Sequence, residues 1–150
     1  MNRPLVIWPL LFLLLFLGIG GLYGGIAMLA DPSGGVLQLS EMLPLLPVSN
    51  FVLPGLFLLL VMGLVPLALI FSLLACPSWR WLVALSAWSK HHWSWTGTVL
   101  LALVLALWLT VQGFLIGFKW AIQYITAITG CLIALLAFTP NLRKHYANKA

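Results

Sequence analysis

Four long apolar runs, separated by three short breaks, constrain the fold of this chain more than any other feature. A bilayer core about 30 Å thick requires about 20 apolar residues in each spanning helix. The four runs approach or exceed that length, and they cover residues 5–30, 51–75, 96–118 and 121–139. The sequence therefore predicts a single transmembrane domain over residues 1–150, with little chain left for a soluble domain.

The composition agrees with this class of protein. Hydrophobic residues make up 63% of the chain and charged residues 6%, whereas soluble domains carry about 25% charged residues. The membrane also accounts for the net charge of +5, because cationic side chains near a cytoplasmic face attract anionic lipids. We therefore expect membrane lipids, and not nucleic acid, as the partner of these charges.

Lys and Arg positions predict the orientation. With both termini cytoplasmic, the outer side carries Lys119 alone, and the inner side carries Arg3, Arg80, Lys90, Arg143, Lys144 and Lys149. Cytoplasmic loops are enriched in Lys and Arg. Asp31 and Glu41, the two carboxylates, fall in the first outer loop. The predicted fold is an all-α, antiparallel four-transmembrane-helix bundle, N-in/C-in, in the cytoplasmic membrane.

The first outer loop and the second span have local signals of their own. After the turn at residues 31–35, Val36, Leu39 and Leu43 recur at helical spacing. This spacing predicts a short amphipathic helix on the outer surface between the first two spans, ended by Pro44 and Pro47. Pro66 lies deep in the second span and predicts a kink there, because proline removes a backbone hydrogen bond.

Small residues predict where helices pack closely, since lipid tails provide no hydrophobic drive for helix association. The first span offers Gly20, Gly21, Gly24 and Gly25. The fourth span has Thr126, Gly130 and Ala134 on one stripe. We expect these residues to contact neighbouring helices.

The inner loop is rich in tryptophan and has two interpretations. Its indoles are those of Trp79, Trp81, Trp88, Trp93 and Trp95. Aromatic and cationic side chains together can bind single-stranded nucleic acid. Tryptophan is also generally enriched at the headgroup level of membrane proteins. We favour interfacial anchoring.

The chain has few residues that are suited to catalysis or to binding a cofactor. Cys76 and Cys131 lie at different predicted depths, so we interpret both as small apolar fillers and not as a redox pair. The spans contain no acidic residue for a proton or cation relay. We therefore expect no enzyme activity, no cofactor and no metal. A weak metal site at the inner rim, formed by His91, His92 and His145, stays open as an alternative.

One group of polar and aromatic residues is predicted near the outer face of the first, third and fourth spans. It comprises Tyr23, Asp31, Trp108, Gln112, Lys119, Gln123 and Tyr124. These residues form either an outward-facing polar pocket or an interfacial layer in which Lys119 reaches the headgroups. We favour the second interpretation. We also expect Lys119 to approach Asp31 more closely than Glu41, holding the outer loop over the bundle.

Several short motifs resemble those of a group of small uncharacterised four-span bacterial inner-membrane proteins. The motifs are the Leu-Ala-Asp-Pro-Ser-Gly sequence at residues 29–34, Pro54-Gly55, His-Trp-Ser-Trp at residues 92–95, and Trp108 with Gln112, Gly117 and Gln123. The resemblance implies a four-helix architecture and a bacterial cytoplasmic membrane. It implies no activity.

Two function classes follow. The first is a non-catalytic membrane protein, an accessory or scaffold subunit that binds a membrane-protein partner or a second copy of itself. The alternative is a lipid or small-molecule binding or transport protein that uses the outward-facing pocket. Small size, glycine-rich helix faces and the lack of a sizeable soluble domain favour the first.

Overall fold

The computed structural model describes residues 3–77, 79, 82 and 89–147, and within them it contains helices and no strand. The prediction of an all-helical chain is confirmed. Its helices are α1 (Ile7–Ala30), η1 (Ser40–Leu45), α2 (Val52–Phe57), η2 (Leu58–Leu64), α3 (Val65–Ala75), α5 (Trp93–Ile116), α6 (Ala121–Ala137) and α7 (Pro140–Ala147). The segments α2, η2 and α3 follow one another without a break and form one rod.

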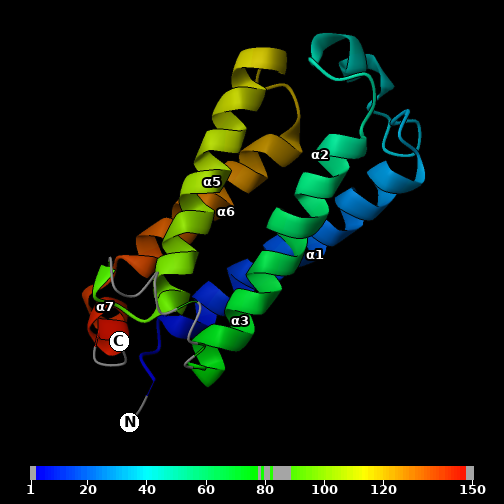
Figure 1. The fold of residues 1–150 in the computed structure, drawn as a ribbon. Helices are drawn as coiled ribbons and strands as arrows, with labels where there is room; N and C mark the ends of the chain where they lie inside the picture. The colour runs from blue at the N-terminus through cyan, green and yellow to red at the C-terminus, as the bar shows by residue number, and fades with distance from the viewer. Residues whose placement is uncertain (1–2, 78, 80–81, 83–88, 148–150) are drawn as a thin grey trace.

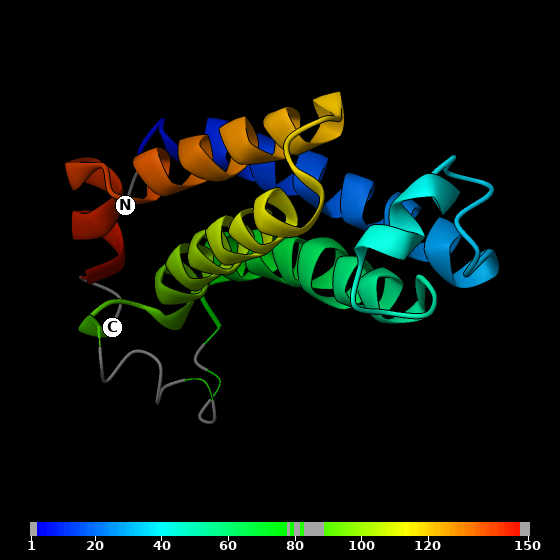
Figure 2. The ribbon, with the colours of Figure 1, turned by 90° about the horizontal axis from the view of Figure 1, so that it is seen from above.

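Four rods run antiparallel, and both chain termini lie at the same end (Figure 1). In the view from above, α6 lies beside α1, whereas α5 lies beside the α2–α3 rod (Figure 2). Each rod contacts two neighbours, since α1 packs on η2 and α6, and α5 packs on α3 and α6. The core between them is apolar, with Leu10, Leu14, Leu105 and Ile133 fully buried.

Three helices are long and apolar enough to cross a membrane, namely α1, the α2–α3 rod and α5. The fourth candidate combines α6 with α7, which meet at a bend of 61°. The helix limits differ by a few residues from the predicted spans. For example, α5 begins at Trp93 because the ring of His92 accepts a hydrogen bond from the Ser94 N–H and caps the helix.

The second rod accommodates Pro66 through a π-helical segment. The Val65 N–H donates to the Leu60 carbonyl, one residue further back than in an α-helix. Pro66, which has no N–H to donate, then falls in the first turn of α3. At the position where the sequence predicts a kink, the rod therefore changes from a π-helical segment to an α-helix.

Close packing of α1 on this rod depends on two of the four predicted glycines. A Cβ atom at Gly21 would overlap the backbone of Met62, and one at Gly25 would lie 2.6 Å from the Leu59 nitrogen. Gly24 would meet only the Leu58 side chain, at 3.7 Å. Gly20 is exposed and has no atom within 4 Å of such a Cβ. Gly20 therefore packs against no other helix among the described residues, because it points away from the face that Gly21 and Gly25 share.

The predicted stripe on α6 contacts α5 through one residue in particular. A Cβ atom at Gly130 would lie 3.6 Å from the Leu105 side chain of α5. Ala134 is half-buried against the core. The Thr126 hydroxyl donates to the Ile122 carbonyl of its own helix and is half-buried.

The first loop differs from the predicted amphipathic helix. A 3₁₀ helix covers Ser40–Leu45, so Pro44 lies inside it and Pro47 follows its end. Val36 is 65% exposed, whereas Met42 is buried. The helix begins late because residues 31–36 form a turn closed by the Asp31 carboxylate, with Gly34 at φ 79°.

Candidate functional site

The two ends of the bundle hold most of its polar side chains. We call the end that includes both termini the terminal end, formed by Arg3, residues 73–77, residues 91–95 and residues 137–147. We call the other the distal end, formed by residues 28–51 and 116–124 (Figure 1). The predicted outward-facing pocket belongs to the distal end and to the adjacent parts of α1 and α5.

Gln123 is buried at the distal end, and both its amide oxygen and its amide nitrogen bond the turn between α5 and α6. Its Oε1 accepts hydrogen bonds from the Lys119 N–H at 3.0 Å and the Trp120 N–H at 3.1 Å. Its Nε2 donates to the Gly117 carbonyl at 3.1 Å. Gln123 therefore caps α6 and ties it to the end of α5.

The other predicted pocket residues do not converge on a common space. Tyr124 donates to the Phe118 carbonyl at 3.0 Å in the same turn, and the Lys119 side chain is exposed. Trp108 stacks on Phe57 of α2 at a centroid distance of 4.3 Å, joining the two rods. Gln112 is half-buried on α5, and Tyr23 is 69% exposed on α1. The structure therefore groups Lys119, Gln123 and Tyr124 in one turn and leaves Tyr23 apart.

Asp31 stabilises its own turn. Its carboxylate accepts the Ser33 hydroxyl at 2.6 Å and the Val36 N–H at 2.9 Å. These bonds, led by that from the Ser33 hydroxyl, lower the pKa of Asp31 from its ordinary value of 3.8. In the described part of the chain, Asp31 forms no ion pair with Lys119. The outer loop is held instead by an apolar cluster of Met28, Met42, Phe51 and Ile116.

An open recess of about 300 Å³ does lie on α5 near the distal end, but its lining is largely apolar. Thr110, Gly113, Phe114 and Phe118 line it, and the Thr110 hydroxyl already donates to the Ala106 carbonyl. None of the predicted pocket residues lines this recess.

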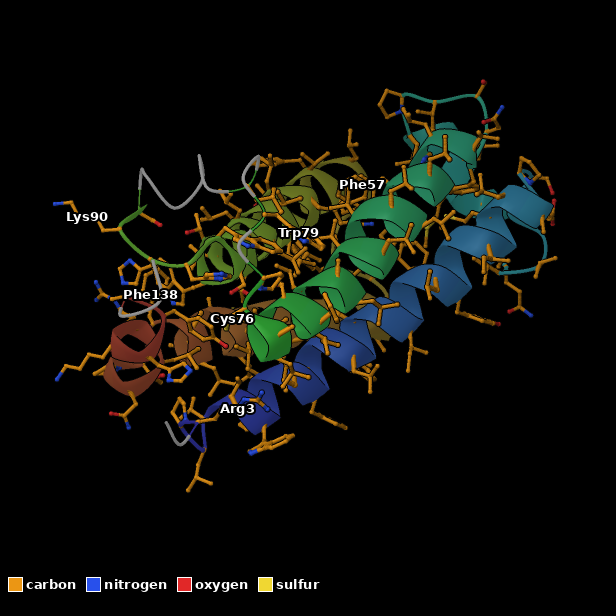
Figure 3. The ribbon with its side chains drawn as sticks, turned by 60° about the horizontal axis from the view of Figure 1, so that its bottom comes forward. Arg3, Phe57, Cys76, Trp79, Lys90 and Phe138 are labelled. Atoms are coloured by element: carbon orange, nitrogen blue, oxygen red, sulfur yellow. The ribbon has the colours of Figure 1, made fainter. Side chains whose placement is uncertain are left out.

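The terminal end contains the interactions that the sequence did not predict. α3 and α6 both end there, and the last carbonyls of a helix lack donors within the helix. Tyr146 donates to the Leu73 carbonyl at 2.7 Å, and Trp95 donates to the Ala137 carbonyl at 2.8 Å. The Arg3 guanidinium donates to the Leu74 carbonyl at 3.0 Å, and Figure 3 shows it beside the end of α3.

Two tryptophans predicted to be interfacial anchors belong to the core. Trp93 is 6% exposed and Trp95 is 7% exposed. The Trp93 indole donates to the Pro77 carbonyl at 2.8 Å and stacks on Trp79, which is 42% exposed. Trp81 and Trp88 lie outside the described residues.

The packing of α7 at the terminal end has a local signal in the sequence that was not used for the prediction. Leu142 and Tyr146 recur four residues apart in a polar tail, and both are buried.

The cysteines and histidines occupy separate environments. Cys76 is half-buried, but Cys131 is exposed on α6, so the prediction that Cys131 fills an interior space is wrong. His91 stacks on Trp95, and His145 meets the edge of Tyr146. Among the described residues, no three His, Cys, Asp or Glu side chains are grouped to hold a metal ion.

A second open recess of about 300 Å³ lies at the terminal end. It is lined by His91, Pro140, Arg143, Lys144 and Ala147. Four of these residues belong to α7 at spacings of three and four, which places them on one face of that helix. Of the two recesses, this one has the more cationic lining.

The chain has no counterpart among the proteins compared with it: no family model, curated protein or solved structure matches it. The distal polar side chains cap helices and turns, and the terminal donors bond helix carbonyls. The cationic recess on α7 is the arrangement that offers charged groups to a ligand.

Proposed function

We propose that this chain is a non-catalytic integral membrane protein of a bacterial cytoplasmic membrane, acting as an accessory or scaffold subunit of a larger membrane assembly. The observation that best supports this role is that buried polar side chains of the bundle form hydrogen bonds within their own helices. The hydroxyls of Ser72, Thr98 and Thr129 each donate to a carbonyl of their own helix. These buried groups are therefore occupied by the helices themselves.

The exposed surface supports membrane insertion. Large apolar side chains face outward along α1, including Phe12 at 67%, Ile19 at 58% and Ile26 at 58% exposure. Similar side chains are exposed on α5 and α6, such as Leu107 at 65% and Leu135 at 68%. A contiguous apolar surface of this kind is stable when lipid covers it.

The fourth span is proposed to be α6 alone, with α7 lying along the membrane surface. α6 has 17 residues, and a helix rises about 1.5 Å per residue, so α6 nearly matches the hydrocarbon core. α7 turns away by 61° and has Arg143 and Lys144 exposed. A polar, cationic helix after such a bend suits a headgroup layer.

The distribution of cations supports the N-in/C-in orientation. Among the described residues, Arg3, Lys90, Arg143 and Lys144 lie at or beside the terminal end (Figure 3), whereas Lys119 lies at the distal end. The positive-inside rule then assigns the terminal end to the cytoplasm. Arg80 and Lys149, which also entered the prediction, lie outside the described residues.

Purification of the tagged full chain in mild detergent, followed by mass spectrometry, tests the accessory role. We expect a membrane protein in stoichiometric amount. Gly21→Leu, which disrupts the α1 packing, should lose this partner, whereas Gly20→Leu should keep it. A tightly held small molecule with no protein partner would contradict the proposal.

Cysteine labelling tests the orientation. In a background with Cys76 and Cys131 replaced by serine, Ser33→Cys should react with a membrane-impermeant reagent added outside. Asn141→Cys, exposed on α7, should react only after the inner face is made accessible. The opposite pattern would reverse the orientation.

A further inference from the structure

We propose that the terminal recess between α7 and the start of α5 binds a phosphate group, supplied by an anionic lipid headgroup or by a small soluble phosphate. The inference rests on the membrane location in the proposed function, because a lipid source requires this recess to lie at a headgroup layer. It is independent of the accessory role.

α7 is a fixed platform for such a site. Leu142 and Tyr146 are fully buried on one side of the helix. The Tyr146 hydroxyl bonds Leu73 of α3, and the Tyr146 carbonyl accepts the His92 N–H at 2.9 Å. Two elements far apart in the sequence therefore hold α7, and its opposite face is presented to the recess in one orientation.

That opposite face is cationic. Arg143 and Lys144 are exposed and line the recess with Pro140 and Ala147. Arginine recognises phosphate through two parallel N–H donors, and lysine adds a point charge. Pro140 is the first residue of α7, so the positive end of the helix dipole also lies at the recess.

His91 completes the lining from the α5 side. Its ring is stacked on Trp95 at a centroid distance of 4.2 Å, which fixes the plane of the imidazole. Its Nδ1 contacts the Ser89 carbonyl, and because a carbonyl only accepts, Nδ1 must donate. Nε2 is then the ring nitrogen that faces a ligand: it donates to a phosphate oxygen when the ring is protonated, and accepts from a protonated phosphate oxygen when the ring is neutral.

The protein supplies no side-chain carboxylate to neutralise these cations. Asp31 and Glu41 are the two acidic residues of the chain, and both lie at the distal end. α1, which separates that end from the terminal end, has 24 residues and is therefore about 36 Å long. This distance exceeds several screening lengths of about 8 Å. An anion from outside the chain is the natural counter-charge.

Lipid retention in native mass spectrometry tests the site. The full chain is prepared in detergent with phosphatidic acid or, as a neutral comparison, phosphatidylcholine. We expect selective retention of phosphatidic acid. Arg143→Gln and Lys144→Gln should each weaken it about 5-fold, the factor that corresponds to about 1 kcal/mol for one cation near a lipid surface.

Lys90→Gln is the matched control, because it removes the same charge at the same end without altering the recess lining. Figure 3 shows Lys90 pointing away from the bundle. An equal loss of binding in Lys90→Gln would show that diffuse charge, and not the recess, attracts the lipid. Absence of binding by both phosphatidic acid and inorganic phosphate would also overturn the proposal.

Inorganic phosphate distinguishes the two sources. If it binds with the same dependence on Arg143 and Lys144 and displaces phosphatidic acid, the site accepts soluble phosphate. If phosphatidic acid is retained in excess inorganic phosphate, the lipid is the ligand. Failure of the partner purification leaves both outcomes unchanged, so the site and the accessory role are tested separately.

Discussion

At the terminal end, side-chain hydrogen bonds link residues that are separated in the sequence by 73, 71 and 42 positions. In the distal turn at Lys119–Tyr124, the bonded residues are six positions apart or fewer. The distal loop is held to the bundle mainly by the apolar cluster around Phe51. The terminal end should therefore respond to the loss of single polar atoms, and the distal end to the loss of buried volume.

The difference follows from what surrounds each helix terminus. At the terminal end, the N-terminal segment, α7 and the start of α5 all contact the carbonyl ends of α3 or α6. At the distal end, the carbonyls of α1 and α5 are bonded by the next residues, as in Asp31 N–H to Ala27 and Gly117 N–H to Gly113. Segments that already satisfy their own polar groups can pack through apolar side chains.

The largest effect is expected from Phe51→Ala. Phe51 is 2% exposed and packs over Gly34 in the distal cluster. Removing this ring should destabilise the fold by about 3–5 kcal/mol, because it leaves a cavity as well as losing buried area. Denaturant unfolding in detergent measures the change. Phe114→Ala, which truncates an 88% exposed ring, should have little effect; equal losses would refute the volume argument.

A smaller loss is expected from Trp95→Phe at the terminal end. Phenylalanine keeps most of the ring but leaves the Ala137 carbonyl without its indole donor. We expect about 2 kcal/mol from the unmade hydrogen bond and the lost volume. Trp8→Phe on the 58% exposed face of α1 is the control in the same unfolding assay. A Trp95→Phe protein as stable as this control would show that the hydrogen bond contributes nothing.

Tyr146→Phe removes only the hydroxyl group of this side chain. The Tyr146 ring is fully buried and its hydroxyl donates to the Leu73 carbonyl. Its loss should cost about 1–2 kcal/mol, since the buried Leu73 carbonyl is then left with the weak thiol donor of Cys76 at 3.7 Å. Tyr124→Phe removes the same atom from a 52% exposed side chain and should leave stability nearly unchanged. A comparable cost at both positions would remove the contrast between the ends.

The smallest effect is expected from Asp31→Asn at the distal end. Hydrogen bonds lower the pKa of Asp31 below 3.8. The ionised carboxylate therefore stabilises the fold above that pH, and this contribution is lost as the pH falls through the lowered pKa. Thermal unfolding of the wild type should show a small loss in acid that Asp31→Asn lacks. Glu41→Gln should retain the loss; its disappearance there would assign the effect to Glu41.

Sequence patterns predicted the elements that depend on local chemistry. Apolar run lengths located the long helices to within a few residues, and small residues predicted close approach at Gly21 and Gly25. The same reasoning was wrong for Gly20. Neighbouring helical residues point about 100° apart, so the register of α1 against its partner decides which glycine is covered.

The long hydrogen bonds were beyond sequence reasoning for a related reason. Trp95 and Tyr146 resemble ordinary interfacial aromatics in the sequence, and their acceptors are backbone carbonyls, which every residue possesses. Only the tertiary arrangement brings them to the ends of α6 and α3. The predicted polar group around Asp31 and Lys119 separated for the opposite reason: local turns satisfied the Asp31 and Gln123 side chains first. The sequence by itself determined a helical chain with three to four apolar helices, because hydrophobicity and length are local properties. The tertiary structure decided which polar groups meet, because hydrogen-bond partners depend on the positions of segments far apart in the chain.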